Sequence, residues 1–197
     1  MIQAIASSTK LRKLNLGSGN YPLKDYVNVD FLPALKPDVV HNLDEYPYPF
    51  EAGSYDRIFG SHVLEHLNDP FAFMRECHRL LAVGGELHIK VPHFSRGFTH
   101  PDHKRGFDVS FPLYFNPKML PWYVGCHLDL KQMRLHWNAQ PYLKAYVASR
   151  PAVVAASAVG AVIDAVANLI PMVFSRLFCF WVGGFEEIEY VFVRPAD

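Results

Sequence analysis

The feature that most constrains the fold of this chain is a glycine turn between two short apolar runs. Residues 14–16 lead into Gly17-Ser18-Gly19-Asn20, and a second run at 26–31 carries Asp30 near its end. Glycine lets the main chain turn sharply and approach a ligand closely, because it has no side chain. The pattern predicts two strands whose ends meet a nucleotide-like ligand at one edge of a sheet.

The short connection after this turn argues against a bound dinucleotide. The dinucleotide fingerprint needs a third glycine, where this chain has Pro22, and a helix N-terminus that holds the pyrophosphate. Residues 21–25 leave no room for a full helix before the next strand. We therefore expect a loop or a single turn in the first crossover, which makes NAD a poor match.

Further short runs predict a layered α/β fold. Five more runs of β-branched or alternating apolar residues are typical of strands, and they cover 39–43, 55–59, 86–91, 130–136 and 188–193. A helix is expected from Asp69, which caps it, and Pro70, which suits its first position, to Gly84-Gly85. Strand, helix and strand in this order make a right-handed parallel crossover, and 197 residues suit a single domain.

Composition limits the partners and the compartment. Lys plus Arg balances Asp plus Glu at 19 each, which excludes the basic footprint of a nucleic-acid-binding protein. The odd number of cysteines, 3, matches no disulfide framework, and residues 1–13 lack the pattern of a signal peptide. These features favour a cytoplasmic protein with small-molecule or protein partners.

The motifs of the first half, in order, resemble those of class I S-adenosylmethionine-dependent methyltransferases, particularly the methyltransferase type 11 family. The resemblance covers about residues 12–95 and runs through Leu14-Asn15-Leu16-Gly17-Ser18-Gly19-Asn20, Val27-Asn28-Val29-Asp30, His41-Asn42-Leu43-Asp44, Ser54-Tyr55-Asp56-Arg57-Ile58, Ser61-His62-Val63-Leu64-Glu65-His66 and Glu76-Cys77-His78-Arg79-Leu80-Leu81-Ala82-Val83-Gly84-Gly85. It implies a doubly wound, seven-stranded, mostly parallel Rossmann-like sheet with an antiparallel last strand.

The resemblance also implies a reaction and a cofactor. The protein would transfer a methyl group from S-adenosyl-L-methionine to an O or N atom of a small-molecule, glycan or lipid-linked acceptor. Residues 12–95 would form the donor-binding core, 96–184 an acceptor-side loop and helical insertion, and 187–194 the last strand. A departure from the family pattern is Asn15, which stands where an acidic residue is usual. It keeps open the alternative of a donor-binding or scaffold protein that has lost catalysis.

The resemblance places the donor site at the ends of several predicted strands. Gly17 and Gly19 would border the methionine moiety, Asp30 would bind the ribose, and Leu43 and Asp44 would contact the adenine. The full predicted donor site consists of Asn15, Gly17, Ser18, Gly19, Asp30, Leu43, Asp44, Ser61, His62, Glu65 and His66.

Residues 62–66 also match a second motif. The spacing His62-x-x-Glu65-His66 is that of zinc peptidases in which two histidines of one helix bind the metal and the glutamate is the base. Here the motif follows a strand, and Asp69 starts a new helix soon afterwards. A zinc hydrolase therefore remains a remote third alternative, and we expect no metal ion.

A loop rich in histidine follows the predicted strand at 86–91. His93, His100 and His103 are candidates for a base that removes a proton from the acceptor, because the imidazole pKa suits that task. Asp102 could orient one of them. Methyl transfer otherwise demands alignment of donor and acceptor more than chemical assistance. The spacing of these residues matches no standard metal site.

A long apolar segment at 151–182 needs a separate explanation. Residues 152–170 are long enough to cross a bilayer, yet Asp164 lies well inside them, and a charge there costs about 2.5–3.5 kcal/mol. The strand at 188–193 must also return to the same sheet. We therefore expect an inserted helix that covers the acceptor pocket as a lid, packs in a homodimer or lies on a membrane surface.

Overall fold

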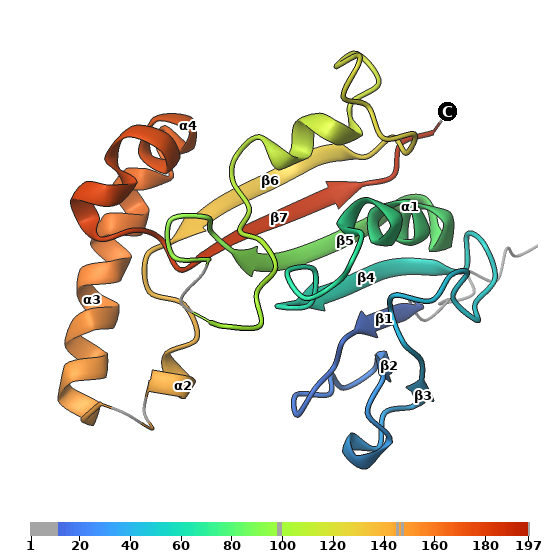
Figure 1. The fold of residues 1–197 in the computed structure, drawn as a ribbon, viewed down its shortest axis with the longest axis horizontal. Coiled ribbons are helices and arrows are strands. Elements are labelled where there is room, and N and C mark those ends of the chain that lie inside the picture. Colours follow the sequence, from blue (N-terminus) through green and yellow to red (C-terminus); the bar gives the residue numbers. More distant parts are fainter. Residues whose placement is uncertain (1–11, 98–99, 145, 147, 197) are drawn as a thin grey trace, which may run out of the picture.

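The computed structural model describes residues 12–97, 100–144, 146 and 148–196, so that Phe98 and Thr99 of the predicted acceptor loop lie outside it. One seven-stranded sheet has the order β3-β2-β1-β4-β5-β7-β6 (Figure 1). The strands are β1 (Lys13–Leu16), β2 (Val27–Asp30), β3 (Val39–Val40), β4 (Tyr55–Ser61), β5 (Leu81–Pro92), β6 (Asp129–His136) and β7 (Glu187–Val193).

The sheet has the predicted mixed topology. Strands β1 to β5 pair in parallel, and β7 runs antiparallel between β5 and β6. The α-helices are α1 (Pro70–Leu80), α2 (Pro141–Lys144), α3 (Arg150–Ala167) and α4 (Pro171–Val173), and shorter helical turns include η1 (Pro33–Leu35), η3 (Phe111–Phe115), η4 (Phe174–Phe178) and η5 (Cys179–Val182). The elements from α2 to η5 form the expected insertion before the last strand.

Two element boundaries differ from the sequence prediction. Asp69 caps α1 as expected, and its carboxylate accepts hydrogen bonds from the N–H groups of Phe71 and Ala72. The helix ends at Leu80 instead of Gly84-Gly85, because the next residue turns into an extended conformation and pairs with β4. The side chain of Arg194 donates hydrogen bonds to the carbonyls of His78, in the last turn of the helix, and of Leu81, directly after it. The predicted strand at 39–43 is reduced to Val39–Val40.

One face of the sheet carries the apolar core. Ile58, Tyr190 and Phe192 lie on this face and are fully buried. The ring of Phe115 in η3 packs against Phe192, and that of Phe71 in α1 packs against Phe115. Helix α1 and turn η3 therefore cover this face together, and Figure 1 shows α1 in front of the central strands.

The opposite face of the central strands is polar and partly open. Side chains alternate along a strand, so His88 and Lys90 of β5 and Glu189 of β7 point away from the apolar core. These three side chains keep between 13% and 30% of their area exposed. Residues 17–26, all of which the structure describes, contain no helix. The expected loss of the first crossover helix thus leaves this face accessible.

The inserted helix α3 protects the outer edge of the sheet. The side-chain amide of Asn168, just after α3, donates to the carbonyl of Leu135 and accepts from its N–H, so it satisfies the free edge of β6. The carboxylate of Asp164 accepts from the N–H of Trp137. Helix α3 is long and apolar enough to cross a membrane, and only 11% of it is buried. The charge within the helix therefore serves to attach it to the sheet.

Candidate functional site

A large cleft lies along the open face and the carboxyl edge of the sheet. Its volume is about 1320 Å³, and it extends from the glycine turn after β1 to the histidines of the loop after β5. The carboxyl ends of parallel strands form the usual ligand site of open α/β folds. The residues that line it include Asn15, Gly17, Ser18, Gly19, Tyr21, Phe59, Ser61, His62, His66, Lys90, Arg96, His100, His103, Gln140, Leu143, Glu186 and Glu187.

The glycine turn forms one end of the cleft, and its N–H groups are hydrogen-bonded within the protein. The N–H groups of Gly17 and Ser18 both donate to the carbonyl of Val29, and that of Gly19 donates to the carboxylate of Asp30. Gly17 has a φ of +70°, and a Cβ atom there would lie 2.7 Å from Cγ2 of Val63. The turn therefore provides space and close approach to the main chain, while its N–H groups stabilise the turn itself.

The two acidic residues predicted to hold the donor lie in different surroundings. Asp30 adjoins the turn, where one oxygen accepts from Gly19 and the other from the N–H of Leu32. Asp44 instead accepts two hydrogen bonds from Asn68 and does not line the cleft. Leu43 is buried in the apolar core. Asp30 does not line the cleft either, but it is hydrogen-bonded to Gly19, which does, so we keep Asp30 in the candidate site and leave out Leu43 and Asp44.

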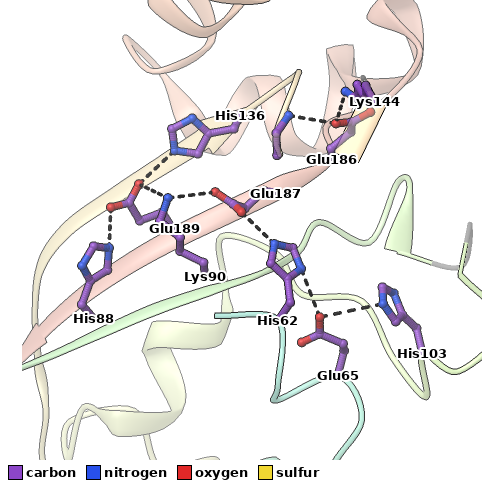
Figure 2. Close-up of polar contacts among 11 residues, drawn as sticks. His62, Glu65, His88, Lys90, His103, His136, Lys144, Glu186, Glu187 and Glu189 are labelled. Carbon is purple, nitrogen blue, oxygen red and sulfur yellow. Dashed lines mark hydrogen bonds and ion pairs between the residues drawn. The ribbon is translucent and has the colours of Figure 1, made fainter. Parts of the chain in front are cut away.

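His62 lines the cleft. Its ring lies between two carboxylates (Figure 2). Its Nε2 atom lies 2.8 Å from Oε2 of Glu187, and its Nδ1 atom lies 3.2 Å from Oε1 of Glu65. Burial alone would lower the pKa of His62, but hydrogen bonds to the two carboxylates raise it to about 9. The imidazole is therefore charged at neutral pH, and its contact with Glu187 joins the end of β4 to β7.

Comparison with known proteins agrees with this geometry. Residues 20–89 match the profile of a methyltransferase domain. An S-adenosylmethionine-dependent methyltransferase from Mesorhizobium loti superposes with a TM-score of 0.56 at 12% identity, covering 94% of this chain and 91% of the other. The chain therefore has the fold of the class I methyltransferases. A search of curated protein sequences gives no match.

Two further structures share the methyltransferase fold. A SAM-dependent methyltransferase from Archaeoglobus fulgidus has a TM-score of 0.55 at 18% identity, covering 94% of this chain and 86% of the other. The [4+2]-cyclase SpnF has a TM-score of 0.52 at 11% identity, covering 95% of this chain and 76% of the other. The second example shows that the fold by itself does not fix the reaction.

Three histidines gather at the far end of the cleft. The ring centroid of His103 lies 5.0 Å from that of His66 and 5.0 Å from that of His100. His66 follows β4, whereas His100 and His103 belong to the loop after β5, so two adjacent strand ends bring them together. Burial lowers the pKa of His103, which keeps its imidazole neutral at neutral pH.

Two residues predicted for the acceptor side, His93 and Asp102, do not line the cleft. His93 is fully buried, and its two ring nitrogens are hydrogen-bonded to the hydroxyls of Ser95 and Ser175, each at 2.8 Å. Burial lowers its pKa to about 4. Asp102 contacts His66 through its backbone carbonyl instead of its carboxylate. We therefore assign His93 and Asp102 structural roles.

The last strand contributes Glu187 to the cleft, which the sequence patterns did not predict. Glu187 is nearly buried, and His62 and Lys90 lower its pKa against the opposing effect of burial. Lys90 lies 3.3 Å from Glu187 across the β5–β7 pair. Alternation along 187–193 could have placed Glu187 and Glu189 on one polar face. Their partners were not predictable, because they come from other strands.

Proposed function

We propose that the protein transfers a methyl group from S-adenosyl-L-methionine to an O or N atom of a small-molecule, glycan or lipid-linked acceptor. The observation that carries the proposal is the continuity of one cleft from the glycine turn to the histidine cluster. Its volume of about 1320 Å³ exceeds the roughly 300–1,000 Å³ typical of pockets for one small ligand. The cleft therefore has room for a donor and an acceptor side by side.

The residues along the cleft suit these two parts. Asn15, the space above Gly17 and the carboxylate of Asp30 lie where the amino-acid end and ribose of the donor would bind. Ser61 and the region around His62 border the middle. The acceptor would then enter at His66, His100 and His103, next to Gln140 and Leu143, which line the cleft from the insertion.

Methyl transfer requires mainly that the donor and the acceptor are aligned and that water is excluded. The bound sulfonium supplies an activated methyl group; the acceptor atom forms a bond to this carbon as the carbon–sulfur bond breaks. The protein contributes by holding the two reactants in line. A hydroxyl or ammonium acceptor also loses a proton, and His100 or His103 is placed to take it. The neutral state of His103 is the form that accepts a proton.

A donor-binding protein without catalysis is the second candidate. The N–H groups of the glycine turn are occupied by Val29 and Asp30, and no helix covers the cleft at residues 17–26. A donor bound there would therefore be less enclosed by the protein than in a site where a helix follows the first strand. The remote zinc-hydrolase alternative loses support, because His62 is held by Glu187 and is not among the potential metal ligands that lie close to His66 in the described residues.

Calorimetric titration with S-adenosylhomocysteine and S-adenosylmethionine tests the proposal first. We expect binding of one molecule per chain. No heat with either compound in a folded sample would reject both the enzyme and the donor-binding protein. Binding together with no methylated product, in a mass-spectrometric screen of sugar, lipid and phenolic pools, would favour the second candidate.

We further propose that the protein works in the cytoplasm as a peripheral membrane protein. The segment at 151–182, for which a lid was one of the expected roles, contributes none of its residues to the lining of the cleft, and Gln140 and Leu143 ahead of it do so instead. Helix α3 and the following turns instead expose large apolar side chains, namely Val154, Val162, Leu169, Ile170, Met172, Leu177, Phe180 and Trp181. Trp181 is 81% exposed, and aromatic residues of this kind favour a membrane interface.

Vesicle flotation distinguishes the membrane from a dimer. We expect binding to anionic vesicles that weakens when Trp181 and Phe180 are both replaced by serine. Leu120→Ser is the matched control, because Leu120 is also exposed but lies outside the insertion. A dimer in solution without vesicle binding would assign this surface to a second copy of the chain.

A further inference from the structure

We propose that Glu65, His66 and His103 bind one divalent transition-metal ion at the acceptor end of the cleft. One ligand atom from each residue lies within 4.8 Å of those of the other two. Glu65 and His66 lie in the turn after β4, and His103 lies in the loop after β5. The set differs from the His-x-x-Glu-His motif, in which His62 would be a ligand.

Both histidines already have the orientation of metal ligands. The Nδ1 atom of His66 lies 3.2 Å from the carbonyl oxygen of Asp102, and that of His103 lies 2.6 Å from the carbonyl oxygen of Gly97. A carbonyl can only accept, so each Nδ1 carries the hydrogen and each Nε2 keeps its lone pair. Histidines that bind metals typically donate their other N–H to a carbonyl or carboxylate in this way.

Glu65 supplies the second, independent observation. Its side chain is 0% exposed, and its Oε2 atom has no hydrogen-bond partner in the described part of the chain. Its Oε1 atom lies 3.2 Å from His62 and 3.8 Å from Nε2 of His103 (Figure 2). A buried carboxylate oxygen without a partner is costly, and a cation coordinated by both oxygens of Glu65 after rotation of its carboxylate would remove this penalty.

The ligand chemistry favours zinc or a similar ion. Two imidazole nitrogens and one carboxylate oxygen form a common ligand set for a site that keeps an open position. Bond lengths of about 2.0–2.2 Å place tetrahedral ligands roughly 3.3 Å apart, so modest side-chain rotation would close the present arrangement. His66 and His103 line the cleft, so the open position would face the acceptor.

This site would change the roles of the acceptor-end histidines. A metal ion can polarise an acceptor oxygen and lower its pKa, which makes deprotonation easier. With Nε2 of His103 bound to the metal, His100 is the histidine that remains as a base. The proposal concerns metal binding itself and goes beyond the methyl transfer proposed above.

A second group of potential ligands carries no such proposal. His136, Glu187 and Glu189 also lie close together. Their carboxylates are already engaged by His62, His88, Lys90 and His136. No buried oxygen there lacks a partner among the described residues.

The test uses the full chain, stripped of metal by dialysis against a chelator. Zinc affinity is measured by competition with a chromophoric chelator, and cobalt absorption reports the coordination. We expect one ion per chain, and an affinity at least about 10- to 100-fold weaker in His66→Asn and His103→Asn. Asparagine retains a donor for the backbone carbonyl but lacks the Nε2 ligand. His127→Asn is the control, because His127 pairs with Asp129 away from the cleft.

Several outcomes would overturn the ligand set. Zinc binding by the wild type no tighter than by the His66→Asn/His103→Asn double variant would do so, provided that the metal-free proteins unfold at the same denaturant concentration. Unchanged affinity in His103→Asn would also do so. Calorimetry with S-adenosylhomocysteine is a separate readout, so a chain that binds zinc but not the donor would reject the proposed methyl transfer alone.

Discussion

The two faces of the central sheet are built from the same strands, but one face packs against the apolar core and the other carries a polar network. On the core face, Tyr190 and Phe192 of β7 are fully buried beneath α1 and η3. On the opposite face, Glu187 and Glu189 of the same strand join a network of histidines and Lys90 (Figure 2). Alternation in a strand therefore supplies an apolar support and a polar cleft floor from one short segment.

The open face results from the lack of a crossover helix between β1 and β2 at residues 17–26. A helix between β1 and β2 would cover the strands beside the cleft, and the chain instead has a short loop there. The exposed strands carry charged and polar residues that tolerate water, and opposite charges satisfy one another across β5, β7 and β6. Without a helix there, the cleft is larger but less enclosed.

The largest expected effect compares one phenylalanine from each face. Phe73→Ala removes a fully buried ring by which α1 packs on the core face, and it should lower the free energy of unfolding by about 3–5 kcal/mol. Phe59→Ala removes a ring that packs against His88 on the open face, and it should cost about 1 kcal/mol. Chemical denaturation measures both. Equal losses would mean that the open face is also a core.

The second comparison concerns the two predicted donor carboxylates. Asp30→Asn should weaken binding of S-adenosylhomocysteine about 10- to 100-fold, because a hydrogen bond to a charged group contributes about 1.5–3 kcal/mol. Asp44→Asn should change the affinity less than about twofold, since Asp44 lies outside the cleft and pairs with Asn68. Calorimetry gives both values. The reverse order would move the donor site toward Asp44.

The smallest expected effect probes the charges of the open face by pH. Hydrogen bonds to Asp164 of α3 and Glu189 of β7 raise the pKa of His136 to about 9, and Glu187 of β7 acts in the same direction. The folded pKa exceeds the unfolded value of about 6.5, so the stabilisation is complete below about pH 6.5 and disappears as the pH rises through about 9.

We therefore expect the unfolding free energy of the wild type to fall by about 1–2 kcal/mol more than that of His136→Gln between about pH 6 and pH 9.5. Part of the dependence should persist in the variant, because the pKa of His62 is raised to a similar value. Parallel curves for the two proteins would show that the His136 contacts contribute nothing to stability.

Local patterns in the sequence predicted most of the fold. The apolar runs located the strands, and Asp69-Pro70 located the start of α1, because strand periodicity and helix capping depend on neighbouring residues. The end of α1 was not predictable in this way. It depends on Arg194, more than a hundred residues further along the chain, which donates to the carbonyls of His78 and Leu81.

The candidate site also contains some residues whose positions the local sequence predicted and others whose positions it did not predict. The spacing of Gly17, Gly19 and Asp30 sufficed to predict that these residues lie together, and a hydrogen bond from Gly19 to Asp30 joins them. Asp44 has an equally suggestive position in the sequence, yet the loop that contains it turns toward Asn68. A short connection fixes the relative position of its two ends, whereas a longer loop can take several paths.

The sequence by itself determined the glycine turn, its carboxylate and the alternation that gives each strand two unlike faces. Only the tertiary structure decided that His62 lies between Glu65 and Glu187, 125 residues away from the latter, and that His66 and His103 face one another. Periodicity acts between neighbours along the chain. The order of strands in the sheet sets which strand ends meet at its carboxyl edge, and no local pattern specifies that order.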